Sequence, residues 1–104
     1  MIYELRTYNV KSGMLGPYLK LFTDVGMPER KPQDNLVGFW FTEFGALNQV
    51  VHIWRFESLA KRAEIRAQLM QNPRWTQDFL VPAMPMLDSM SSAIMNAAPF
   101  SPLQ

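Results

Sequence analysis

The segment from Leu36 to Ser58 constrains the fold more than any other part of the chain, because it alternates like two strands joined by a turn at Gly45. A β-hairpin built from this segment places one set of side chains on a single face: Phe39, Phe41, Glu43, Asn48, Val50, His52 and Trp54. That face is too polar for an ordinary core, and it holds the only histidine of the chain. We therefore expect the hairpin to form one wall of a pocket.

Composition narrows the class of protein. The chain has 104 residues, of which 48% are hydrophobic, and this size and content predict a single domain over residues 1–104. Aromatic residues make up 12% and there are eight methionines, so we expect a second copy of the chain to cover part of the apolar surface, giving a homodimer. The net charge of +1 argues against nucleic acid and anionic membranes as partners.

The sequence also bears on cofactors and location. The lack of cysteine excludes disulfides, thiolate nucleophiles and cysteine-based zinc or iron–sulfur sites, and we expect no metal and no cofactor. Residues 1–10 alternate like a strand without the pattern of a signal peptide, and no apolar run approaches the roughly 20 residues that cross a bilayer. We therefore expect a cytoplasmic protein without membrane insertion.

Periodicity predicts strands and helices on both sides of the hairpin. We expect strands at residues 2–10 and 86–96, and helices at residues 15–25, 59–70 and 73–80. Together with the hairpin, these elements follow the order strand, helix, strand, strand, helix, strand. That order predicts an α+β fold, the ferredoxin-like βαββαβ plait with an antiparallel sheet.

Capping residues, glycines and prolines mark the expected helix ends. Gly26 and Pro28 should end or kink the first helix, after which the polar residues 29–35 lead to the hairpin. Ser58 should cap the second helix. The third helix should end before the prolines that follow it, Pro82 and Pro85.

The plait predicts which residues meet at the centre of the sheet. Its first and third strands are neighbours, so Arg6 or Glu4 should lie beside His52. The helices cover one face only, and a second copy of the chain would bury the other face, forming a dimeric α+β barrel.

Four segments carry a resemblance to a known family: IYELRTY, GFWFTEFGALNQVVHIWRFESLAKR, NPRW and APFSPL. They resemble the NIPSNAP family over nearly the whole chain. The resemblance implies membership of the dimeric α+β barrel superfamily, whose members bind ligands between sheet and helices. Family members are mostly uncharacterised, and the better known ones are linked to vesicle traffic or mitochondrial quality control as interaction proteins. Distant superfamily members include cofactor-free oxygenases, isomerases and haem-degrading enzymes, and a haem held by His52 is the least favoured of these alternatives.

His52 is the candidate catalytic residue, because its unperturbed pKa lies near neutrality. We expect Glu4, Glu43 or Asn48 to fix its tautomer. The candidate ligand-binding residues are Arg6, Glu4, Tyr8, Phe39, Phe41, Asn48 and Trp54. For each of them the alternative is ordinary packing, and for Arg6 with Glu4 it is a simple ion pair.

The second helix is expected to bury one side, formed by Leu59, Ala63, Ala67 and Met70. Arg62 and Arg66, four residues apart, are interpreted as part of a solvated basic face. Alternation places Trp40 and Trp54 on opposite faces of the sheet, so only Trp54 should lie near His52.

The predicted function is binding of a small aromatic or acidic ligand in a cavity of the homodimer. As an enzyme, a cofactor-free oxygenase or isomerase, the protein would use His52 to deprotonate a phenol or enol, while Arg6 or Asn48 stabilises the oxyanion. The alternative is a non-catalytic interaction or scaffold module that binds proteins through its outer helices or the Phe100 tail. A closed cavity smaller than a few water molecules would favour that alternative.

Overall fold

The computed structural model describes residues 1–30 and 35–104. Part of the predicted polar connection, residues 31–34, lies outside the described residues. In chain order, the strands and helices are β1 Ile2–Val10, α1 Leu15–Leu21, η1 Phe22–Gly26, α2 Met27–Glu29, β2 Leu36–Phe41, β3 Gln49–Phe56, α3 Leu59–Leu69, η3 Arg74–Leu80, α4 Val81–Ala83, η4 Met84–Met86 and β4 Leu87–Met95. This is the predicted βαββαβ order.

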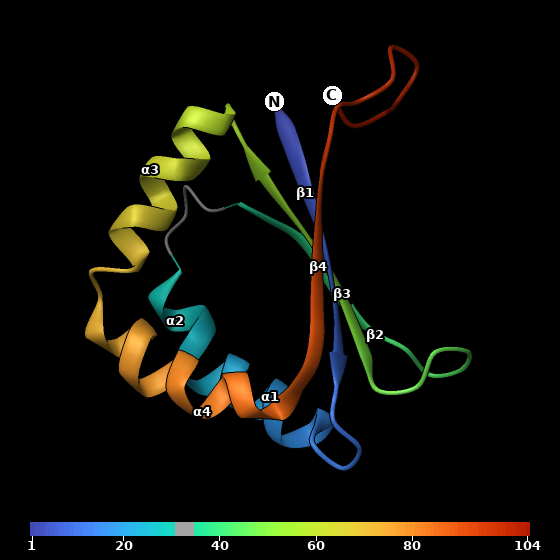
Figure 1. The fold of residues 1–104 in the computed structure, drawn as a ribbon. Coiled ribbons are helices and arrows are strands. Elements are labelled where there is room, and N and C mark those ends of the chain that lie inside the picture. The colour runs from blue at the N-terminus through green and yellow to red at the C-terminus, as the bar shows by residue number, and fades with distance from the viewer. Residues whose placement is uncertain (31–34) are drawn as a thin grey trace.

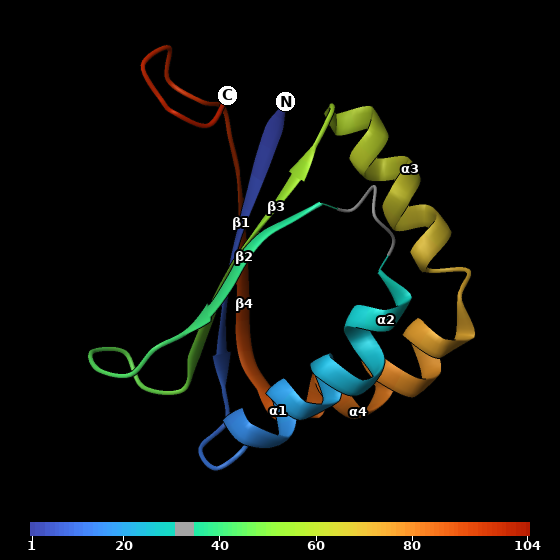
Figure 2. The same cartoon turned by 180° about the vertical axis from the view of Figure 1, so that it is seen from behind.

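The four strands form one antiparallel sheet in the order β2-β3-β1-β4. All the helices lie on one face of this sheet (Figures 1 and 2). The central strands β1 and β3 pair so that Arg6 lies opposite His52 and Glu4 lies opposite Trp54. The ferredoxin-like α+β plait is therefore confirmed, and so is the expected meeting of Arg6 with His52.

Strict alternation along β3 builds the floor of the core. Val50, His52, Trp54 and Phe56 are buried under the helices, whereas the residues between them are only partly buried. Tyr18 from the first helical stretch packs above them and is 1% exposed. Trp40 is 53% exposed and lies opposite Val51, on the other face from Trp54, as alternation predicts.

The first helical stretch does not end at Gly26: of the two predicted outcomes, an end or a kink, the end is wrong, and the hydrogen-bonding pattern instead changes after Gly26 from π-helical to α-helical. It continues to Glu29 because η1 is π-helical, with the Met27 N–H donating to the Phe22 carbonyl, and Pro28 begins a new turn where its missing N–H is not needed. Gly26 instead allows close packing: a Cβ there would lie 2.9 Å from Cε1 of Phe79.

The last helical stretch also runs past the position predicted for its end. After η3, which is π-helical, the chain continues through α4 and the short 3₁₀ turn η4 to Met86. Pro82 and Pro85 each lie in the first turn of a new segment, where a proline costs no helical hydrogen bond. Ser58 caps α3 as predicted, accepting a hydrogen bond from the Lys61 N–H at 3.0 Å.

The sheet face opposite the helices carries Leu5, Val51 and Ile53, and the C-terminal tail packs against one end of it. There the Tyr3 hydroxyl donates to the Gln104 carbonyl at 2.9 Å. Both the tail and the β2–β3 loop project on the side away from the helices (Figures 1 and 2). The second copy expected to cover this face stays a prediction.

Candidate functional site

A cavity of about 210 Å³ lies between the sheet and the helices within one chain. Its polar lining consists of Arg6, Tyr8, Arg30, His52 and Arg66. Its remaining lining is mainly apolar and consists of Tyr18, Phe22, Met70, Trp75, Phe79, Leu80, Ala83, Met84, Leu87 and Met90. A cavity of about 150 Å³ is enough to hold benzene, so this one has room for a single ring with a small substituent.

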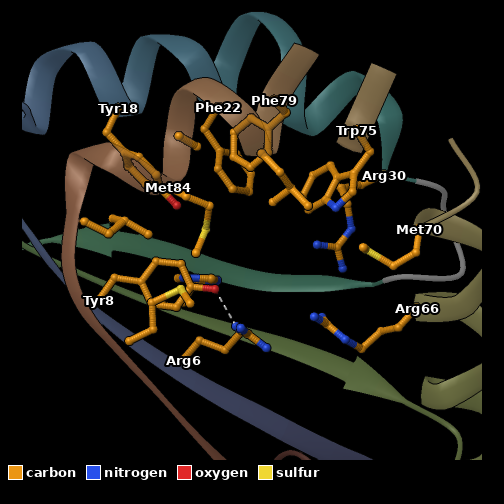
Figure 3. A pocket seen from close by; sticks show the side chains of 15 residues that line it. Arg6, Tyr8, Tyr18, Phe22, Arg30, Arg66, Met70, Trp75, Phe79 and Met84 are labelled. Carbon is orange, nitrogen blue, oxygen red and sulfur yellow. Dashed lines mark hydrogen bonds between the residues drawn. The ribbon is translucent and has the colours of Figure 1, made fainter. Parts of the chain in front are cut away.

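Positive charge is concentrated on one side of the cavity. Figure 3 shows the guanidinium groups of Arg6, Arg30 and Arg66 directed toward one another, with Tyr18, Phe22 and Phe79 gathered on the opposite side. Burial lowers the pKa of Arg66, and the positive charges of Arg6, Arg62 and Arg30 lower it further. Such mutual repulsion is relieved when an anion binds among the arginines.

Glu4 is a carboxylate, 1% exposed, that holds two of the arginines. Its Oε1 accepts from Nε of Arg62 at 3.0 Å, and its Oε2 accepts from Arg62, from Arg6 and from the Ser92 hydroxyl at 2.7, 2.8 and 2.6 Å. Burial raises the pKa of Glu4, but the hydrogen bonds from Arg62 and Ser92 and the charges of both arginines outweigh burial and lower that pKa to about 2. Glu4 is therefore ionised and orients Arg6.

Tyr8 connects Arg6 with the cavity. Nε of Arg6 donates to the Tyr8 hydroxyl oxygen at 2.6 Å (Figure 3). Because that oxygen already accepts a hydrogen bond, the Tyr8 O–H remains able to donate to another acceptor. Tyr8 and Arg6 thus present donors on the same wall of the cavity.

His52 is 2% exposed and enclosed by aromatic rings. Phe39 stacks on the imidazole with centroids 4.4 Å apart, and Tyr8 meets its edge at 4.8 Å. The Trp54 indole N–H donates to Nδ1 of His52 at 2.6 Å. Burial lowers the pKa of His52 to about 3, with further lowering by the charges of Arg6 and Arg30, so the imidazole is neutral near neutral pH.

Similarity to known proteins extends along almost the entire chain. The NIPSNAP family model matches residues 3–102. The chain belongs to the NIPSNAP family. It is 32% identical over 105 residues to human Protein NipSnap homolog 3A, covering 100% of this chain and 42% of that protein. This NIPSNAP chain therefore spans about two fifths of the length of that curated relative.

Solved structures share the fold of this NIPSNAP chain. A NIPSNAP family protein of unknown function from Agrobacterium tumefaciens is 45% identical, with a TM-score of 0.93 over 100% of this chain and 94% of the other. An antibiotic biosynthesis monooxygenase is 13% identical, with a TM-score of 0.68 over 95% of this chain and 100% of the other. The second likeness shows the fold alone.

The residues predicted from the NIPSNAP sequence fall into three groups. Arg6, Tyr8 and His52 line the cavity. Phe39 and Trp54 contact the His52 ring, and Glu4 holds Arg6. The structure does not bring two predicted residues to the cavity, Phe41 and Asn48.

Loop geometry explains the position of Asn48. Its φ of 57° breaks the alternation assumed for the hairpin, so Asn48 does not continue the strand face, and Glu43 lies beyond the end of β2 at Phe41. Phe41 does continue that face but is 54% exposed beyond the end of the cavity. Among the described residues, the hydrogen bond to the His52 ring comes from Trp54 and not from the expected partners Glu4, Glu43 or Asn48.

The sequence interpretation missed the arginines of α3. Its buried side is formed by Ile65 and Leu69, so the expected burial of Leu59, at 59% exposed, and of the residues on its side was wrong. Arg62 and Arg66 are only partly exposed: they share the inner side, because Arg62 lies three residues before Ile65 and Arg66 three residues before Leu69. That spacing is the signal that could have found them.

No comparable local spacing in the sequence indicates that Arg30 lies at the cavity. Its guanidinium lies 3.9 Å from the centre of the Trp54 ring and 5.3 Å from that of Trp75, which places it at the cavity.

Over residues 1–30 and 35–104, no group of three histidine, aspartate or glutamate side chains converges to offer a metal site. Within the same ranges, no helix is both long and apolar enough to span a membrane.

Proposed function

We propose that this NIPSNAP chain binds a small organic anion, a carboxylate or phenolate carrying one apolar ring, in the cavity between sheet and helices. The observation that carries the proposal is the convergence of Arg6, Arg30 and Arg66 on one side of a largely apolar cavity. Guanidinium groups bind planar carboxylates through paired hydrogen bonds, and aromatic side chains pack against flat rings. Both halves of the lining therefore match one class of ligand.

Charge and volume support the same ligand class. Glu4 pairs with two arginines, Arg6 and Arg62, so positive charge exceeds negative charge within this group of three side chains. Among the described residues, Arg66 forms no ion pair. At about 30 Å³ per water molecule, the volume of about 210 Å³ equals several waters, above the size that would favour a module without a ligand.

The geometry favours binding and oxyanion stabilisation over proton abstraction by His52. A general base needs a free lone pair facing the substrate, but Nδ1 of His52 accepts the Trp54 N–H. If the ligand reacts, the arginines would stabilise the negative charge of an enolate or phenolate. Oxygenase or isomerase chemistry is thus an extension of the binding proposal and needs its own base.

Benzoate is a suitable probe, because it combines one ring with one carboxylate. We expect titration calorimetry to detect benzoate binding and to find weaker binding of benzamide, its neutral analogue. Arg66→Gln should weaken benzoate binding about tenfold or more, since a hydrogen bond to a charged group is lost. Arg74→Gln is the matched control: Arg74 is 56% exposed and pairs with Asp78 away from the cavity. Equal binding of benzoate and benzamide, or an unchanged affinity in the Arg66 variant, would contradict the proposal.

A homodimer is a second part of the proposal. The outer sheet face with Val51 and Ile53 is the surface that a second copy would cover, and exposed Trp40 lies beside it. Val51→Lys should shift sedimentation toward the monomer, whereas Gln77→Lys, on the exposed side of η3, should not. A monomeric wild-type chain would contradict the proposed homodimer. The proposal also retains the predicted cytoplasmic location.

The rival proposal, an interaction module, rests on Phe100. Its side chain is 91% exposed on the tail, where a protein partner could cover it. A wild-type chain that binds neither benzoate nor benzamide in the calorimetry would shift weight to this rival.

A further inference from the structure

One ring nitrogen of His52, a residue that lines the cavity, has an unmet hydrogen-bonding requirement. Nε2 of His52 is buried and has no hydrogen-bond partner within residues 1–30 and 35–104. Buried polar groups in proteins are nearly always paired, and a group left without a partner in a cavity wall points to a ligand. His52 is 2% exposed, so bulk water does not meet this requirement.

The hydrogen bond on the other ring nitrogen determines what Nε2 can do. An indole N–H only donates, so Nδ1 of His52 must carry the lone pair that accepts from Trp54 at 2.6 Å. A neutral imidazole has one proton, which then resides on Nε2. This nitrogen is consequently a donor, and the matching ligand atom is an acceptor.

The surrounding charges keep the ring neutral. Arg6 and Glu4 face His52 from β1, Arg30 reaches the same cavity from the end of α2, and Arg66 reaches it from α3. Three of these four groups are cations, and protonating Nδ1 would also break the hydrogen bond from Trp54. Ligand acidity therefore does not convert His52 into an imidazolium.

We propose that His52 is a neutral hydrogen-bond donor whose Nε2–H binds an oxygen of the cavity ligand, and that Trp54 is the positioning residue that sets its tautomer. This inference rests on the proposed binding of an organic anion and deepens it: the ligand must offer an acceptor oxygen to His52 as well as negative charge to the arginines. A ligand with only an apolar body, or with a donor group at this place, does not fit.

Nuclear magnetic resonance of the single histidine tests the tautomer without any ligand. Protein labelled with nitrogen-15 in histidine gives two ring nitrogens, which their couplings to the ring protons distinguish. We expect the proton on Nε2 and none on Nδ1, unchanged from neutral to mildly acidic pH. Trp54→Phe keeps a ring under Arg30 but removes the N–H, and should give a mixture of tautomers; Trp40→Phe, on the outer face, should not. A proton on Nδ1 in the wild type would overturn the inference.

The ligand arm uses benzoate and two substitutions of the histidine. His52→Gln retains an N–H near the position of Nε2, whereas His52→Phe retains only a ring. We expect benzoate binding to fall roughly ten- to hundredfold in the Phe variant and to be largely restored in the Gln variant. A residue that only fills space would show the opposite order, because Phe fills the site better than Gln.

The outcomes separate this inference from the proposal on which it rests. If benzoate binds the wild type and depends on Arg66, but both His52 variants bind equally well, the donor role is wrong and the anion site stands. If benzoate fails to bind while the proton is on Nε2, the tautomer stands and its assignment to an anionic ligand is overturned. In the wild type with benzoate, the Nε2 proton signal should shift and exchange more slowly.

Discussion

Replacing Glu4 by Gln removes the charge that holds two arginines beside the cavity. The carboxylate is buried and accepts hydrogen bonds from Arg6, Arg62 and Ser92. Gln preserves the shape and one acceptor oxygen, so the substitution tests the charge rather than the packing. We expect a less stable protein because the two guanidinium groups lose their counter-ion.

The lowered pKa of Glu4 gives the size of the effect and its pH dependence. A fall of the pKa from 4.5 to about 2, at about 1.4 kcal/mol for each pH unit, corresponds to about 3–4 kcal/mol of folding free energy. Because Arg6 and Arg62 are partly exposed, we reduce the expected value to about 2–3 kcal/mol. Since the folded-state pKa is lowered, this stability is present above pH 4.5 and is lost as the pH falls toward about 2.

Urea denaturation of the wild type and the Glu4→Gln variant measures this contribution. Near neutral pH the variant should be less stable by about 2–3 kcal/mol, and by about pH 2 most of the difference should have disappeared. Glu64→Gln is the matched control, because Glu64 is 56% exposed and its ion pair with Lys61 at 3.5 Å contributes little. A stability difference that persists unchanged in acid, or none near neutrality, would refute the reasoning.

Two further predictions concern the helices. Gly26→Ala should lower the free energy of unfolding by about 1–2 kcal/mol, because the new Cβ meets Phe79 at 2.9 Å. Gly16→Ala is the control, since its new Cβ meets nothing within 4 Å and should not lower the free energy of unfolding. Thermal melts followed by circular dichroism compare the two variants, and equal melting temperatures would contradict the packing argument. Ser58→Ala should lower the free energy of unfolding by about 1 kcal/mol in the same assay, because the helix cap is lost. Ser12→Ala, in an exposed turn, is the control. An unchanged melting temperature in the Ser58 variant would show that the cap is dispensable.

Local patterns predicted most of the backbone. The first strand was expected at residues 2–10 and is observed at Ile2–Val10, and the last was expected at residues 86–96 and is observed at Leu87–Met95. Alternation and capping are set by neighbours in sequence, so they can be recognised without the fold. The effect of the prolines was misjudged because it depends on the hydrogen-bonding pattern of the helix: Pro28 and Pro82 lie in the first turn of the α-helical segments that follow π-helical ones.

The sequence predicted only the part of the candidate site that follows from the order of the strands in the sheet. The pairing of Arg6 with His52 followed from the adjacency of two central strands. Arg62 and Arg66 were assigned to solvent because charged residues on a helix are usually exposed. They face inward because a carboxylate from another element, Glu4, meets Arg62, while Arg66 lines the cavity.

The sequence by itself determined the βαββαβ order, the NIPSNAP family, and a hairpin wall that carries His52 next to Arg6. Only the tertiary structure decided the charge of His52 and the hydrogen bond on which its proposed tautomer rests. Both depend on burial, on the 2.6 Å contact with Trp54 and on arginines brought from separate elements. Electrostatic energies vary with distance and with exclusion of water, and neither quantity is encoded in the identity or spacing of neighbouring residues.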